Sequence, residues 1–171
     1  PLCFDGFFDP VTTRLDKDTG KGIPYATYAF ATHMTEVAVE EATGFCRVKK
    51  VYAAHDVGKT VNPTLIEGQI QGGVAMGVGF ALLEEFIPGQ TTSFDGYYLP
   101  TAMDAPEMKV LLVEDPEPTG PFGAKGVGEP ALIPQAASVV NAIRDAVQVD
   151  VRELPCDMER LKILLERKER K

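Results

Sequence analysis

Residues 62–86 combine the periodicity of one long helix with five glycines, and this limits what the helix can pack against. Asn62-Pro63 marks its start, because Asn caps helices and proline is accepted at the first helical position. Each glycine inside a helix costs roughly 1 kcal/mol relative to alanine, so five of them require a compensating contact. Small residues fall along one side: Gly68, Gly72, Ala75 and Gly79. That side can accept either another backbone or a flat ligand, and the sequence leaves both possibilities open.

The elements around this helix predict an α+β fold, with a mainly antiparallel sheet and a single domain over residues 1–171. Turn signals predict a loop-like start, and β-forming residues predict a hairpin and a later strand. A second helix is expected after Glu129, and a charged C-terminal helix ends the chain. The expected ranges are 1–24 for the loop, 25–39 and 45–54 for the hairpin, 108–113 for the strand, and 131–147 and 157–171 for the helices.

Composition excludes several classes of function. The 17 Lys and Arg residues against 25 Asp and Glu residues leave a net charge of −8, which argues against a nucleic-acid partner. The longest apolar run, 72–83, is too short to cross a bilayer, so no membrane partner is expected. Three scattered cysteines without a CxxC pair fit a reducing compartment, and we expect a cytoplasmic protein without a cysteine metal site.

The segment 114–130, rich in proline and glycine, contains Gly-Ala-Lys-Gly-Val-Gly-Glu at positions 123–129. Backbone amides of a glycine-rich turn before a helix can bind an anion, and Lys125 adds positive charge. A nucleotide-binding P-loop is not supported, because Lys125 is followed by Gly126 instead of Ser or Thr. Glu129 stands where we expect the next helix to begin. Its carboxylate either complements the helix dipole or acts as a general base.

The histidines and cysteines give weaker signals. His33 lies in a predicted strand without metal-ligand partners at usable spacing, so a core or surface histidine is expected. His55 precedes Asp56, a pair that can act in catalysis, but no Ser or Cys nucleophile motif accompanies it. Cys46 and Cys156 are expected to be small buried apolar residues.

Three stretches carry a resemblance to a known family: His-Asp-Val-Gly-Lys-Thr-Val-Asn-Pro at 55–63, Glu-Gly-Gln-Ile-Gln-Gly-Gly at 67–73 running to Glu85, and Gly-Pro-Phe-Gly-Ala-Lys-Gly-Val-Gly-Glu-Pro at 120–130. In this order and spacing they resemble the C-terminal part of the molybdenum-binding region of the molybdenum hydroxylases, the xanthine dehydrogenase/aldehyde oxidoreductase family. The resemblance runs from about Tyr25 to the end of the helix after Glu129.

The resemblance implies a molybdopterin cofactor with molybdenum, possibly in its cytosine dinucleotide form. It implies that Glu129 is the general base that takes the proton from the metal's hydroxide ligand during hydroxylation of an aldehyde or N-heterocycle, with water as the oxygen source. Gln69 corresponds to the glutamine that hydrogen-bonds the pterin. The remaining cofactor contacts that it implies are Gly72, Gly73, Lys125, Gly126, Val127 and Gly128, the loop residues acting largely through backbone groups.

Family members are much longer, and nothing here resembles their earlier half. We therefore expect a fragment or a small subunit whose partners are the rest of the molybdopterin-binding region and 2Fe-2S and FAD domains or subunits, and which binds little cofactor alone. A non-catalytic module that only packs against a partner is the alternative. A dinucleotide-binding domain is disfavoured because no strand–GxGxxG–helix unit is present. Xanthine, other purines, nicotinate, aldehydes and aromatic thioesters all stay open as substrates.

Overall fold

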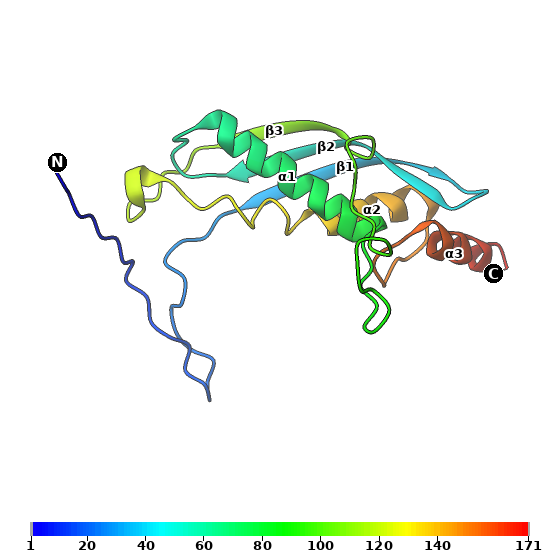
Figure 1. Ribbon diagram of the computed structural model, residues 1–171, viewed down its shortest axis with the longest axis horizontal. Helices are drawn as coiled ribbons and strands as arrows, with labels where there is room; N and C mark the ends of the chain where they lie inside the picture. Colours follow the sequence, from blue (N-terminus) through cyan, green and yellow to red (C-terminus); the bar gives the residue numbers. More distant parts are fainter. Residues whose placement is uncertain (1, 171) are drawn as a thin grey trace.

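The computed structural model describes residues 2–170 as a three-stranded sheet covered on one face by helices (Figure 1). This arrangement confirms the expected α+β class. In chain order the elements are β1 (Ala31–Glu40), β2 (Phe45–Asp56), α1 (Pro63–Leu82), β3 (Glu107–Val113), the short 3-10 helix η1 (Pro121–Gly123), α2 (Gln135–Val147) and α3 (Met158–Glu169).

The sheet has the order β1-β2-β3. β1 and β2 form the expected antiparallel hairpin, in which Ala31 pairs with His55 and Glu40 with Phe45. β3 joins the other side of β2 in parallel, with Lys50 opposite Glu107. Parallel neighbours require a long crossover connection, and α1 with the loop after it supplies that connection. The antiparallel hairpin is therefore extended by one parallel strand, which the sequence pattern did not indicate.

Several element boundaries differ from the expectation. β1 begins at Ala31 instead of Tyr25, because the partner of Ala31 is His55 and β2 ends one residue later. Residues 25–30 therefore have no strand of the hairpin opposite them. α1 ends at Leu82 instead of Phe86.

The early end of α1 has a visible cause. The backbone N–H groups of Leu83 and Glu84 both donate to the carbonyl of Gly79, so the regular ladder stops there. The two glutamates that follow the helix then bind elsewhere: Glu84 accepts a hydrogen bond from the Tyr97 hydroxyl, and Glu85 pairs with Arg160.

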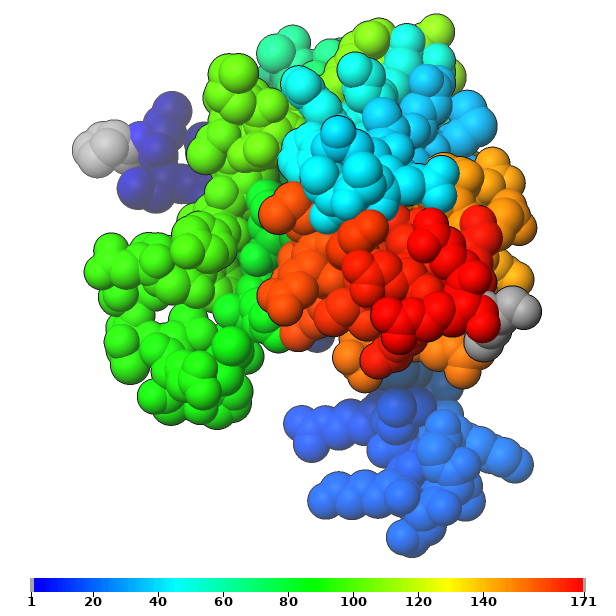
Figure 2. All heavy atoms as spheres, turned by 90° about the vertical axis from the view of Figure 1, so that its right-hand side faces the viewer, coloured from blue at the N-terminus to red at the C-terminus, as the bar shows by residue number. Residues whose placement is uncertain are grey.

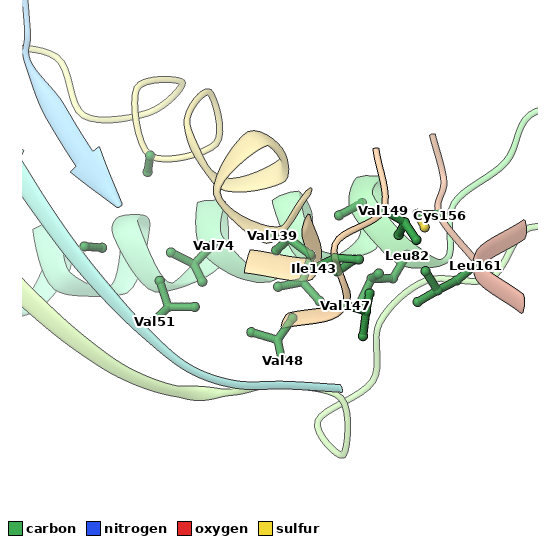
Figure 3. Close-up of a cluster of buried hydrophobic side chains, with 14 of the residues drawn as sticks. Val48, Val51, Val74, Leu82, Val139, Ile143, Val147, Val149, Cys156 and Leu161 are labelled. Carbon is green, nitrogen blue, oxygen red and sulfur yellow. The ribbon is translucent and has the colours of Figure 1, made fainter. Parts of the chain in front are cut away.

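The core lies between the sheet and the helices (Figure 3). Inward residues alternate along the strands, as in β1, where every second residue is partly buried. Val51 of β2, Val74 of α1 and Ile143 of α2 are fully buried within one cluster. The other face of the sheet is open, and Met34 and Leu111 are exposed there. The helices therefore cover a single face.

α3 closes the hairpin end of the molecule, where Gly44 lies against Met158 and Lys162. Cys156 is buried just before α3 and Cys46 is half-buried, as expected for small apolar residues. Residues 2–30 contain neither helix nor strand, and Figure 2 shows this segment projecting from the body. No helix within residues 2–170 has the length and apolar character that a bilayer crossing requires.

Candidate functional site

Two loops meet at the end of β2 and hold each other through their backbones. The N–H of Lys59 donates to the carbonyl of Gly123 at 2.6 Å, and the N–H of Lys125 donates to the carbonyl of Val57 at 3.0 Å. Gly58 makes this approach possible: its φ is +63°, and a Cβ there would collide with the Gly123 carbonyl. The glycine loop of 123–129 is thus fixed to the segment that joins β2 to α1.

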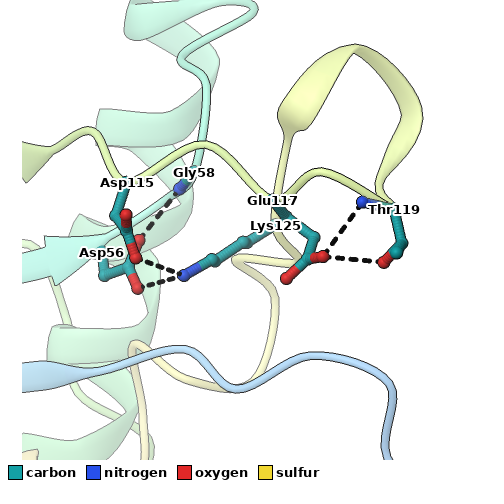
Figure 4. Close-up of polar contacts among 6 residues, drawn as sticks. All are labelled: Asp56, Gly58, Asp115, Glu117, Thr119 and Lys125. Atoms are coloured by element: carbon teal, nitrogen blue, oxygen red, sulfur yellow. Dashed lines mark hydrogen bonds and ion pairs between the residues drawn. The ribbon is translucent and has the colours of Figure 1, made fainter.

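A buried ion pair reinforces this junction (Figure 4). The Lys125 Nζ lies 2.6 Å from Asp56 Oδ2, and only 5% and 7% of the two side chains are exposed. Asp56 Oδ1 also accepts the Gly58 N–H at 3.1 Å, and the exposed Asp115 lies 3.3 Å from the ammonium. Burial raises the pKa of Asp56, but hydrogen bonds from Lys125 and Gly58 outweigh burial and leave that pKa below its usual range. The hydrogen bond to Asp56 raises the pKa of Lys125.

The side chain of Lys125 therefore faces Asp56. Its charge was expected to serve a bound anion, but in the structure it neutralises a buried carboxylate. A contact between Lys125 and a cofactor stays a prediction. Because its ammonium faces Asp56 and its N–H donates to Val57, only its carbonyl oxygen is left to make such a contact. On the other side of the same loop, Glu117 accepts hydrogen bonds from the N–H and hydroxyl of Thr119, which closes the turn before η1 (Figure 4).

Glu129 does not stand at a helix start. Residues 128–134 form turns, and α2 begins only at Gln135, six positions after Glu129. Pro134 explains the delay: it has no N–H to donate, and it disfavours helical geometry at Ile133. The expected helix from residue 131 is thus wrong at its start. Because Glu129 is exposed and outside α2, stabilisation of the helix dipole does not account for it.

The loop before Glu129 presents its backbone outward. Within residues 2–170, the N–H groups of Gly126, Val127, Gly128 and Glu129 donate to no protein acceptor. A Cβ at Gly126 or Gly128 would meet nothing within 4 Å, so both glycines border open space. The side chain of Val127 packs against the core and anchors the loop. The result is a fixed turn with free donors beside an exposed carboxylate.

α1 runs alongside the segment that carries Glu129. A Cβ on Gly73 would lie 2.5 Å from the Cβ of Ala131, and one on Gly77 would lie 2.5 Å from the Cβ of Gln135. The two segments thus run side by side, and Gln69 lies one turn before Gly73 on the same side of α1. Figure 1 shows this segment passing along α1 on its way to α2.

The glycines of α1 divide between the two roles that the sequence left open. Gly73 and Gly77 allow close packing of another backbone segment. Gly68 and Gly72 face open space, with nothing within 4 Å of an added Cβ, and Gly79 packs against Pro100. The stripe of small residues expected from the sequence is therefore open only in its first half. A cofactor contact by Gly73 stays a prediction, since packing already accounts for its missing side chain.

A polar network that the sequence did not predict connects β1, β2 and α2. His55 Nε2 and His33 Nε2 are 2.7 Å apart, and His33 Nδ1 lies 2.7 Å from Gln135 Oε1. Gln135 donates to the Thr35 hydroxyl at 3.3 Å, which in turn lies 2.7 Å from the hydroxyl of Ser138. Burial and the neighbouring His33 lower the pKa of His55 to about 4, and burial lowers that of His33. Burial therefore favours the neutral form of both rings.

The alternation of β1 was the one available signal for this network, because it places His33 and Thr35 on the same face. The partners lie on other elements and could not be found from spacing. No three His, Cys, Asp or Glu side chains in the described part of the chain gather into a metal site.

A separate cleft lies elsewhere in the fold. It has a volume of about 910 Å³ and is lined by residues that include Val48, Val78, Leu82 and Cys156. These residues belong to the start of β2, the end of α1 and the approach to α3, whereas the glycine loop meets the end of β2 and the start of α1. The cleft is therefore separate from the region around Glu129.

Comparison with known proteins identifies relatives in both sequence and fold. The sequence profile of the molybdopterin cofactor-binding domain matches residues 1–106. The chain is 36% identical over 151 residues to the aldehyde oxidoreductase of Megalodesulfovibrio gigas, covering 87% of this chain and 17% of that protein. It is 35% identical over 167 residues to the putative xanthine dehydrogenase molybdenum-binding subunit of Escherichia coli K12, covering 94% of this chain and 22% of that protein.

The likeness extends to solved structures. The aldehyde oxidoreductase from Desulfovibrio gigas superposes with a TM-score of 0.86 at 36% identity, over 91% of this chain and 17% of that one. The Cu,Mo-CO dehydrogenase superposes with a TM-score of 0.76 at 30% identity, over 84% of this chain and 19% of that one. The chain thus spans less than a quarter of the length of these relatives.

Proposed function

Because the chain belongs to the xanthine dehydrogenase/aldehyde oxidoreductase family of molybdenum hydroxylases and covers part of the molybdopterin-binding region, we propose that it supplies the general base and one wall of the cofactor site. Glu129 is the proposed base. The observation that carries this proposal is the exposed carboxylate of Glu129 at the end of a fixed turn whose amide groups are free.

The residues present fit a molybdopterin cofactor. Its phosphate and pterin groups need hydrogen-bond donors and a surface without side chains, and the turn 126–129 offers both. Gln69 is exposed on the neighbouring side of α1, with no side-chain hydrogen bond to the described residues, so its amide can bind the pterin. Gly72 borders open space beside it and allows close approach. When bound, the cofactor supplies the redox-active molybdenum at which the substrate is oxidised.

The chain itself contributes proton transfer and orientation. The Glu129 carboxylate would accept the proton of the hydroxide whose oxygen is added to the substrate carbon. General base catalysis of this kind contributes roughly 10²–10⁴-fold to a rate. The amides of Gly126 to Gly128 donate hydrogen bonds to anionic groups without rearrangement, because the turn is already fixed by its contacts with 57–59. Lys125 stays paired with Asp56, and its N–H holds the turn to the Val57 carbonyl.

The proposal extends to a substrate class and to partners. The proposed substrate class is an aldehyde or an N-heterocycle, since the relatives are named aldehyde oxidoreductase, xanthine dehydrogenase and nicotine 6-hydroxylase. The proposed partners are the rest of the molybdopterin-binding region, together with iron–sulfur and FAD domains or subunits that carry the electrons away. A cytosine dinucleotide form of the cofactor belongs to the same proposal.

The test is Glu129→Gln in the enzyme assembled with the rest of its molybdopterin-binding region. We expect unchanged molybdenum content and a loss of turnover of about 10²-fold or more with an artificial electron acceptor, because glutamine keeps the shape of the side chain but cannot accept the proton. Glu41→Gln is the matched control, an exposed glutamate in the turn between β1 and β2, and it should leave the rate unchanged. Normal turnover of Glu129→Gln would instead support a module that only packs against its partner.

A further inference from the structure

Two consecutive residues at the end of β2, His55 and Asp56, reach opposite ends of the segment that carries Glu129. Neighbours on a strand point to opposite sides, so one short stretch of backbone can hold two separate elements. Asp56 contacts Lys125, four residues before Glu129, and His55 connects through His33 to Gln135, six residues after it. The segment 125–135 is otherwise built of turns and loop, with α2 starting at its last residue.

The Asp56 anchor is buried and charged. Its ion pair with Lys125 has a length of 2.6 Å, and both side chains are almost fully covered. The second Asp56 oxygen, Oδ1, accepts a hydrogen bond from the Gly58 N–H, and this bond orients the carboxylate. The two carboxylate oxygens thus bind two different loops, and a shift of Lys125 would leave a buried carboxylate without its counter-charge.

The His55 anchor is buried and neutral. Since Gln135 Oε1 can only accept, the Nδ1 of His33 carries the proton, and the His33 Nε2 accepts from the Nε2–H of His55. His55 is 1% exposed and Gln135 is 0% exposed, so neither side chain has water as an alternative partner. The position of Gln135, and with it the start of α2, is therefore tied to β2 across the core.

We propose that Asp56 and His55 are positioning residues that hold the Glu129 carboxylate at the cofactor, each by fixing one end of the segment 125–135. The inference rests on the proposed function of Glu129. It assigns a role to the His-Asp pair of the first motif, which has no nucleophile to activate. Neither side chain acts on substrate: each restricts the position of Glu129.

The experiment measures kcat, KM and molybdenum content of the assembled enzyme carrying Asp56→Asn or His55→Leu, alone and combined with Glu129→Gln. A base displaced by about 1 Å loses up to about 10²-fold in rate, so we expect kcat to fall at least about 10-fold while KM and metal content change little. In the Glu129→Gln background the same substitutions should lower the residual rate less than about twofold, because the base they position is already gone.

Two further variants keep the outcome clear. Glu107→Gln breaks the 2.7 Å ion pair with Lys50 at the far end of β3 and should leave kcat unchanged. If the Asp56→Asn variant fails to assemble, the double variant Asp56→Asn with Lys125→Met removes both buried charges and tests the same Asp56 anchor. An equal fold-loss in the presence and absence of Glu129 would overturn the positioning role, as would full activity of both single variants beside an inactive Glu129→Gln. An active Glu129→Gln would instead remove the proposed base, and the positioning role with it.

Discussion

Adjacent glycines of α1 should respond to the same substitution with opposite signs. Gly72→Ala places a methyl group in open space, since nothing lies within 4 Å of the new Cβ. Gly73→Ala places it 2.5 Å from the Cβ of Ala131 and 2.8 Å from the carbonyl carbon of that residue. The second contact involves backbone, which cannot rotate away as a flexible side chain does.

The expected magnitudes follow from two contributions. Replacing glycine by alanine inside a helix stabilises by about 1 kcal/mol, and Gly72→Ala should show that gain. Forcing a methyl group into a packed contact costs about 1–3 kcal/mol, and the contact distances at Gly73 place its cost at the upper end. After the helix gain is subtracted, Gly73→Ala should lose about 2 kcal/mol. The two variants should therefore differ by about 3 kcal/mol, or about 6–12 °C in Tm for a chain of this size.

Urea and thermal unfolding of the two variants, followed by circular dichroism, measure this difference directly. Gly68→Ala is a second control, because it also meets open space and should match Gly72→Ala in stability. If Gly73→Ala proves as stable as Gly72→Ala, the close packing of α1 against residues 131–135 is wrong.

Three further predictions concern the packing and the buried histidine. The pKa of His55 falls from 6.5 to about 4 on folding, so its contribution to stability is complete above pH 6.5 and is lost as the pH falls toward 4. This shift amounts to about 3 kcal/mol, and His55→Gln should flatten the pH dependence of stability in urea titrations. Ile143→Ala empties a fully buried site and should lower the unfolding free energy by about 2–5 kcal/mol. Gly44→Ala, at a φ of +79° and against Met158, should destabilise the chain, and an unchanged Tm would contradict the docking of α3.

Local patterns predicted the elements well because their causes are local. The Asn62 side chain accepts from the Leu65 N–H and Pro63 opens α1, as capping chemistry requires. The hairpin followed from β-forming residues around a turn. The pattern also gave β3, but it could not give the parallel direction, since that depends on where α1 carries the chain.

Boundaries failed where a distant partner decides them. Tyr25 to Phe30 have strand-forming side chains, yet β2 is too short to pair with them. The periodic residues 131–134 fit a helix by apolar spacing, but Pro134 delays its start, and Ala131 serves as the surface on which Gly73 packs. For residues 25–30 the deciding factor is a partner strand far away in the chain, whereas for residues 131–134 the local effect of Pro134 outweighs the apolar spacing.

The same distinction explains the site. Glu129, Gln69 and the glycine loop could be proposed because they form contiguous motifs, whereas the residues that hold them are paired across 69 positions for Asp56 and Lys125 and 102 for His33 and Gln135. A histidine judged alone on its strand has no visible partner, and a lysine in a glycine loop is naturally assigned to an anion. Both assignments change once burial is known, because a buried charge must be paired and a buried ring nitrogen must be hydrogen-bonded. The motif at 55–63 is thus connected to the motif at 120–130. Its His-Asp pair should be tested through its effect on Glu129 and not as a catalytic pair of its own.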